Sequence, residues 1–182
     1  MSRWIYRVRQ FFEALLATPT PADLELVRQT LTPAQSALFS RLQPSEQAHA
    51  VRVLRQVWAV CRKEGFDPPV DLQVAALLHD VGKARFPLSV WERVVIVLGK
   101  AFVPDAAMRW GTPPQGSAAP RGWKRPFVIA AQHPAWGAEM AAEQDTSPGA
   151  AALIRRHQTS PSTGTSEEDR LLAILQSVDD KN

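Results

Sequence analysis

Four histidines are the residues of this chain whose chemistry most needs an explanation. They are His49, His79, His133 and His157, and the sequence contains no others. Each lies in, or at the end of, a segment with the apolar periodicity of a helix. A single histidine on an apolar helix face is usually a hydrogen-bonded core residue. A functional site is therefore indicated only if other chemically active residues accompany the histidines.

Two acidic residues accompany them at unusual places. Asp80 directly follows His79 within the stretch Leu-Leu-His-Asp-Val-Gly-Lys (residues 77–83), where the helix should bury apolar side chains. Asp179 continues the apolar stripe of the last helix and lies at its C-terminus, where the helix dipole disfavours a negative charge. A buried carboxylate needs a positive partner. A divalent cation would supply that charge.

Imidazole and carboxylate ligands together suit Zn, Fe, Mn and similar ions. A carboxylate such as that of Asp80 can bridge two ions, and Gly82 releases the backbone just after the His-Asp pair. Lys83 follows closely, and a cation beside a metal site suits a phosphate substrate. The residues thus predict a metal centre that acts on a phosphate group.

Helices must position these residues. The apolar periodicity and the turn residues predict helices over 3–17, 22–31, 33–42, 45–65, 72–79, 91–102, 134–144, 148–157 and 166–179. Thr32, Asp71 and Ser166 are the predicted N-caps, and Gly65 is a predicted C-terminal stop. Residues 104–126, rich in Pro, Gly, Ser and Ala, predict a long loop. Because no convincing strand pair is found, the predicted fold class is all-α.

The segment 91–102 leaves an alternative open. It contains the β-branched run Val94–Val97, which is typical of a strand as well as of a buried helix. The helix predicted over residues 3–17 is basic and amphipathic. We expect its apolar face to pack against the domain or a second subunit, with insertion into a membrane interface as the alternative.

The order of the chemical residues resembles the HD-domain superfamily of metal-dependent phosphohydrolases, in its HDIG-like branch. The pattern H…HD…D corresponds here to His49, His79-Asp80 and Asp179, and His-Asp-Val-Gly-Lys stands where the branch has His-Asp-Ile-Gly-Lys. The resemblance covers the chain from about residue 47 to the C-terminus. It implies an HD-domain-like helical bundle over 44–182, preceded by an N-terminal amphipathic helical extension over 1–43.

The resemblance also implies a ligand set for one metal ion, which consists of His49, His79, Asp80 and Asp179. Members with two ions have further histidines before the last aspartate, and His133 and His157 match these in order. The implied cofactor is one or two divalent ions (Mn, Fe, Zn, Mg or Co), with Asp80 as the bridge. The branch that cleaves cyclic di-GMP has two adjacent histidines and a Gly-Tyr-Pro motif. This chain has neither, since Arg156 and Gln158 flank His157 and residues 159–161 are Thr-Ser-Pro, so the resemblance does not favour hydrolysis of cyclic di-GMP.

These features predict a metal-dependent phosphohydrolase or phosphodiesterase whose substrate is a nucleotide, a cyclic nucleotide or a related phosphate ester. A metal-activated water would be the nucleophile. Asp80 and Lys83 are the candidate catalytic residues, with Asp80 also accepting a proton and Lys83 binding the substrate phosphate. We expect residues 91–125 to govern substrate choice. Two alternatives remain: a di-iron oxygenase of the HD fold, and a non-catalytic regulatory HD domain that binds a nucleotide.

Composition limits which partners and which cellular location we expect for this chain. The chain has 182 residues and a net charge of +3, which is too weak to predict nucleic-acid binding. No signal peptide or transmembrane segment is recognised in the sequence. With only one cysteine, Cys61, a disulfide within the chain is excluded, and we expect a cytoplasmic location.

Overall fold

The computed structural model describes residues 16–112, 119–159 and 164–180, and every regular element in these ranges is a helix. This confirms the all-α prediction. The helix predicted over 3–17 lies almost wholly outside the described residues. In chain order the elements are α2 (Pro21–Thr30), α3 (Pro33–Phe39), α4 (Pro44–Glu64), α5 (Val70–Leu78), the short 3-10 helix η1 (Val81–Arg85), α6 (Val90–Phe102), α7 (Pro104–Trp110), α8 (Arg125–Ala142), α9 (Pro148–Arg156) and α10 (Glu167–Asp179).

Most helix ends follow their sequence signals. The hydroxyl of Thr32 caps α3 and that of Ser166 caps α10, each accepting a hydrogen bond from the third backbone N–H of its helix. Gly65 ends α4 in the left-handed conformation with φ 81°. The N-cap predicted at Asp71 is wrong. Pro69 precedes the first turn of α5, and the Asp71 carboxylate instead accepts a hydrogen bond from the Ser147 hydroxyl at 2.6 Å.

The main hydrophobic core is built around α5, which packs against α4, α9 and α10. Its fully buried side chains include Leu54, Leu72, Leu77, Leu78, Ile154, Leu172 and Leu175. Helices α2 and α3 contribute Val27, Leu38 and Phe39 to the same cluster. No helix among the described residues is long and apolar enough to span a bilayer.

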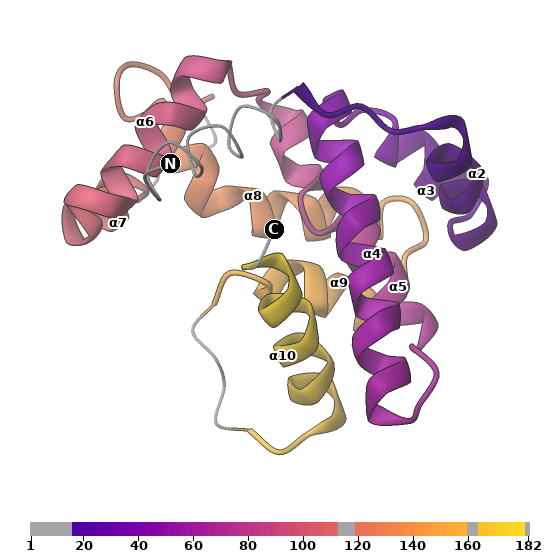
Figure 1. The fold of residues 1–182 in the computed structure, drawn as a ribbon. Helices are drawn as coiled ribbons and strands as arrows, with labels where there is room; N and C mark the ends of the chain where they lie inside the picture. Colours follow the sequence, from indigo (N-terminus) through magenta and orange to yellow (C-terminus); the bar gives the residue numbers. More distant parts are fainter. Residues whose placement is uncertain (1–15, 113–118, 160–163, 181–182) are drawn as a thin grey trace, which may run out of the picture.

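Helices α6 and α7 lie at the opposite end of the molecule from α2 and α3, and α8 runs between them and the core (Figure 1). Residues 90–102 form a helix, so the strand alternative is wrong. The long loop predicted over 104–126 is also wrong, because it contains α7 and the start of α8. Pro104 occupies the first turn of α7, where proline is well tolerated, and the alanines that follow favour a helix.

Helix α8 is longer than predicted. It begins at Arg125 and passes through Pro134, whereas the sequence predicted a helix that begins at Pro134. His133 therefore lies in the middle of a helix and not at its boundary. The reason that this helix tolerates an internal proline is found in the hydrogen bonds of the site.

Candidate metal centre

The fold brings all six predicted ligand residues together in two groups of three. Within each group the candidate ligand atoms lie within 4.8 Å of one another. The outer cluster, which is partly exposed, consists of His49, His79 and Asp179. The inner cluster, which is fully buried, consists of Asp80, His133 and His157.

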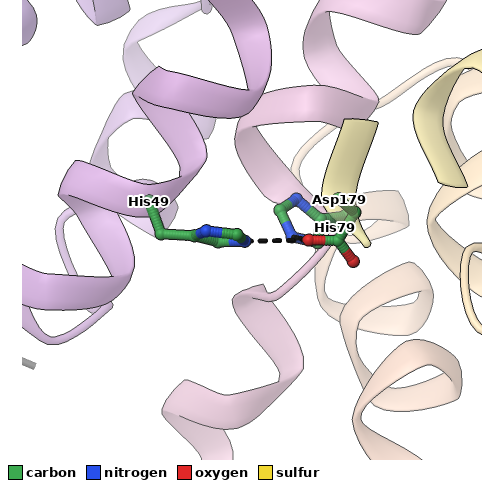
Figure 2. A group of neighbouring side chains, drawn as sticks. All are labelled: His49, His79 and Asp179. Atoms are coloured by element: carbon green, nitrogen blue, oxygen red, sulfur yellow. Dashed lines mark hydrogen bonds and ion pairs between the residues drawn. The ribbon is translucent and has the colours of Figure 1, made fainter. Parts of the chain in front are cut away.

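The outer cluster joins three helices that are far apart in the sequence. His49 lies on α4, His79 directly follows α5, and Asp179 is the last residue of α10. Figure 2 shows the His49 imidazole pointing at the Asp179 carboxylate, with His79 beside it. Oδ1 of Asp179 is 2.9 Å from Nε2 of His49 and 3.4 Å from Nε2 of His79. The side chains of His49 and Asp179 are each 20% exposed, whereas that of His79 is fully buried.

The inner cluster is arranged around one carboxylate oxygen. Oδ1 of Asp80 is 3.1 Å from Nε2 of His133 and 3.9 Å from Nε2 of His157. The two histidine Nε2 atoms are 3.3 Å apart. The other oxygen of Asp80, Oδ2, is 3.6 Å from Nε2 of His79 in the outer cluster. The Asp80 carboxylate thus presents one oxygen to each cluster.

The three buried histidines are oriented by the same device. In each, Nδ1 lies within hydrogen-bond distance of the carbonyl oxygen three residues earlier: Ala76 for His79 (3.0 Å), Ala130 for His133 (3.0 Å) and Ile154 for His157 (2.7 Å). A carbonyl oxygen only accepts hydrogen bonds, so Nδ1 carries the proton in the neutral ring. The lone pair of each ring is then on Nε2, which faces the cluster.

Two of these carbonyls are available because their helices end, and the third because of Pro134. The carbonyls of Ala76 and Ile154 lie in the last turns of α5 and α9, where no later backbone N–H of the helix donates to them. Within α8, the carbonyl of Ala130 would normally accept from the N–H of residue 134, which proline lacks. Nδ1 of His133 donates to it instead. Pro134 thereby frees the group that orients His133.

The donor set fits a divalent cation. Nε2 of His79 is buried and has no hydrogen-bond partner, which is costly for a polar atom unless it binds something else. Two ligands that are each about 2.1 Å from one ion lie about 3.0–3.4 Å apart in octahedral or tetrahedral geometry. The distances from Asp179 Oδ1 to His49 and His79 are 2.9 and 3.4 Å. Imidazole and carboxylate donors suit Zn, Fe, Mn and Co.

Lys83 lies beside the bridge between the clusters. Its Nζ is 2.6 Å from Oδ2 of Asp80, and its side chain is 22% exposed, so it borders both the cluster and solvent. Gly82 allows this arrangement. A Cβ added at Gly82 would lie 2.0 Å from the backbone oxygen of His133, so only glycine lets η1 approach α8 this closely. The close approach brings Asp80 and Lys83 to His133.

The electrostatics of the two clusters differ. Burial lowers the pKa of His79, but the carboxylates of Asp80 and Asp179 outweigh it and raise the pKa to about 8. Burial lowers the pKa of His157 to about 3, and positive charge on His79 and His133 acts in the same direction. The pKa of His133 is also lowered, chiefly by burial. Without a metal, the outer cluster therefore holds a proton at neutral pH and the inner cluster does not.

Both carboxylates are held in their charged form. Burial would raise the pKa of Asp80, but the nearby Lys83 and His79 charges keep it well below its usual range. Burial likewise opposes ionisation of Asp179, but the hydrogen bond with His49 and the adjacent His79 imidazole lower its pKa well below the usual range. Burial would lower the pKa of Lys83, but the Asp80 carboxylate raises it. Both clusters thus offer an anionic ligand at neutral pH.

Two cavities adjoin the centre, and a third shares residues with both. One of about 490 Å³ is lined by His157 and Asp179, and one of about 220 Å³ by Lys83 and His133. A third, also about 220 Å³, lies between α6, α7 and α8. Lys100 and Gln158 line all three. Neither residue belongs to a sequence motif, and only the packing of α6 brings Lys100 to the site.

A comparison with protein-family models identifies the family to which the chain belongs. The model described as HD domain matches residues 47–180, a range that runs from just before His49 to just after Asp179. Neither the search of curated proteins nor the search of solved structures found a match. HD domains bind divalent metals, and both candidate clusters lie inside the matched range. The chain belongs to the HD domain family.

Proposed function

We propose that this protein is a metal-dependent phosphohydrolase with two divalent ions, one held by each cluster and both bound by Asp80. The observation that carries the proposal is the arrangement of the six ligands. Asp80 presents its two oxygens to the two clusters, and three buried histidines direct their Nε2 lone pairs into them. This arrangement supports two ions better than one, because each cluster by itself supplies three protein ligands.

When bound, divalent ions at this site supply an activated water and neutralise charge on the phosphoryl oxygens. The protein's own residues position the phosphate. The Lys83 ammonium borders the 220 Å³ cavity that also contains His133, and it binds a non-bridging phosphoryl oxygen. Its pKa is raised by Asp80 although burial would lower it, so Lys83 stays charged at neutral pH and serves as an electrostatic clamp.

Asp80 is a metal ligand in this proposal rather than a general base. Its pKa is held well below the usual range, because Lys83 and His79 outweigh the effect of burial. A carboxylate with so low a pKa is a weak proton acceptor at neutral pH. The role of proton acceptor, considered from the sequence, is therefore less well supported than the role of bridging ligand.

The test is hydrolysis of two chromogenic esters, p-nitrophenyl phosphate and bis(p-nitrophenyl) phosphate, by protein loaded separately with Mn, Fe, Zn and Co. We expect turnover with at least one metal and one ester. In that combination Lys83→Met should lower kcat/KM by about 10²-fold, the typical effect of removing one electrostatic stabiliser of the transition state. Metal content per chain, measured by mass spectrometry, should stay at the wild-type value.

Lys63→Met is the matched control, because Lys63 is an exposed lysine in the last turn of α4. It should hydrolyse the esters at the wild-type rate. Absence of turnover with every metal would contradict the proposal. Tight binding of a nucleotide without turnover would then support a regulatory HD domain.

A further inference from the structure

Lys100 occupies the wall shared by the three cavities beside the metal centre. It lies on α6, seven residues after Arg93, so the two side chains share one face of the helix. Both line the 220 Å³ cavity that contains Lys83 and His133. Two helical turns of α6 thus present two cations towards the metal centre.

Helix α6 is fixed to the core by ionic contacts near its N-terminus. Arg93 donates to Oε1 of Glu46 at 2.7 Å and to Oε1 of Gln43 at 2.8 Å, which joins α6 to the start of α4. Glu92 pairs with Arg125 at the start of α8. Since Arg93 and Glu46 are only 16% and 6% exposed, this contact holds α6 in place over the site.

Close packing fixes the C-terminal half of α6. A Cβ added at Gly99 would lie 2.5 Å from Cε1 of Phe127, so glycine is what allows α6 to lie directly against α8. Lys100 follows Gly99. Its position beside the cavities is therefore set by the helix packing and does not depend on a loop.

The ammonium group of Lys100 differs from the neighbouring cations in its ion pairing. Of the three cations that line these cavities, Lys83 pairs with Asp80 and Arg93 with Glu46. No ion pair joins Lys100 to another residue of the described ranges. Asp180 also lines the 490 Å³ cavity, and Asp179 there is held by the two outer histidines. Lys100 is thus available to bind an anionic group of a ligand.

The third cavity has a different character. Apart from Lys100 and Gln158 its lining is apolar: Pro104, Ala107, Met108, Phe127, Ala130 and Ala131. It continues from the cavity of Lys83 and His133, with which it shares Ala130 as well as Lys100 and Gln158. An apolar cavity next to a phosphate site favours a ligand that combines the two chemistries.

We propose that Lys100 and Gln158 bind an oxygen of the substrate's phosphate group, and that the apolar cavity receives an aromatic or other apolar group esterified to it. The substrate class is then a phosphate ester of an aromatic or other apolar alcohol, and not the phosphate of a small polyol. This inference rests on the proposed function, since it places the phosphate between Lys100 and the metal centre.

The test measures binding by titration calorimetry on the metal-loaded protein, with two probes that have no ester bond to hydrolyse, inorganic phosphate and phenylphosphonate. Wild type should bind both, and phenylphosphonate more tightly. Lys100→Met should raise the Kd of both probes about tenfold, the effect expected for one charge-assisted hydrogen bond. Lys63→Met removes the same charge from a distant exposed site and should leave both Kd values unchanged.

A second variant tests the apolar cavity separately. Ala131 is exposed and lines only that cavity of the three, so Ala131→Leu fills space there without adding charge. It should raise the Kd of phenylphosphonate at least threefold and leave that of inorganic phosphate unchanged. Equal Kd values for Lys100→Met and wild type, or no binding of either probe to wild type, would overturn the inference.

The two proposals fail in different ways. Protein that binds metal and hydrolyses esters, but whose Lys100→Met variant binds phosphate normally, would refute the inference and leave the proposed function intact. Protein that never turns over an ester, but whose phosphate binding depends on Lys100, would refute the phosphohydrolase and retain an anion-binding role for Lys100.

Discussion

The outer and inner clusters use similar ligands but are built in different ways. The inner cluster is closed, since Asp80, His133 and His157 are each at most 5% exposed. The outer cluster reaches solvent through His49 and Asp179, at 20% each. Burial lowers the pKa of the two inner histidines, whereas carboxylates raise that of His79. Without a metal, the inner histidines are thus neutral and able to bind a cation, whereas the outer cluster carries a proton.

The difference also reflects which helices meet at each cluster. The outer cluster needs α10 to dock against α4, because His49 and Asp179 are 130 residues apart in the sequence. The inner cluster needs only the junction of η1 with α8 and α9, which is closely packed around Gly82 and Gly137. We therefore expect the inner site to form with the core and the outer site to depend on the last helix.

The largest effect is expected at the residue that the clusters share. Asp80→Asn keeps the shape of the side chain and removes the charge that both ions need. Metal content should fall from two ions per chain to fewer than one, and kcat/KM should fall at least about 10³-fold. Asp67→Asn, at an exposed carboxylate distant from the site, should change neither. Two ions retained by Asp80→Asn would show that Asp80 is not the bridge.

Substitutions in one cluster should separate the two sites. His133→Asn removes an inner ligand, and His49→Asn removes an outer one. Each variant should bind about one ion per chain when assayed by mass spectrometry, because the other cluster keeps its three ligands. Loss of both ions from either variant would mean that the clusters form a single cooperative site and that the comparison between them is false.

Chelator kinetics should show the same difference without any mutation. The outer ion has a path to solvent past His49 and Asp179, whereas the inner ion is enclosed. Removal by excess EDTA should therefore follow two phases, with the rate of the slower phase at least about tenfold lower. His49→Asn should abolish the fast phase and leave the slow one. A single phase that releases both ions would argue against a difference in exposure.

The smallest effect is on the stability of the metal-free protein as a function of pH. The pKa of His79 is about 8, above the usual value of about 6.5, so its stabilising contribution is complete below pH 6.5 and is lost as the pH rises through 8. The pKa of His157 is about 3, so its contribution is present above pH 6.5 and is lost as the pH falls towards 3.

Histidine NMR titration of chelated protein measures both groups directly. One ring that titrates near pH 8 and is missing from His79→Asn is the expected result for the outer cluster. A ring that stays neutral down to about pH 3 and is missing from His157→Asn is expected for the inner one. Two rings that both titrate near pH 6.5 would show that the clusters do not differ electrostatically.

Sequence patterns predicted much of the fold because they depend on local rules. Thr32, Gly65 and Ser166 mark helix ends through their own hydrogen bonds or backbone conformation. The patterns failed where tertiary contacts decide. A proline such as Pro134 normally signals a helix start. Here Nδ1 of His133 donates to the Ala130 carbonyl in place of the N–H that proline lacks, and the helix continues. Asp71 has the right type for a cap but bonds Ser147 of another helix.

The candidate site shows the same limit. The His-Asp pair and Lys83 are recognisable because they are adjacent in the sequence, and the order of the other ligands follows a family pattern. Lys100 and Gln158 have no such signal. Gly99, whose missing side chain lets α6 approach Phe127, is what brings Lys100 to the cavities, and a sequence does not reveal which glycine has that role.

The proposed function depends most on two metal sites that share Asp80. The most direct measurement is a crystal structure of metal-loaded protein with anomalous scattering recorded at the edge of the bound metal. Two peaks are predicted, one in contact with His49, His79 and Asp179 and one in contact with His133 and His157, each with an oxygen of Asp80 in its coordination. A single peak, or peaks that Asp80 does not touch, would contradict the account.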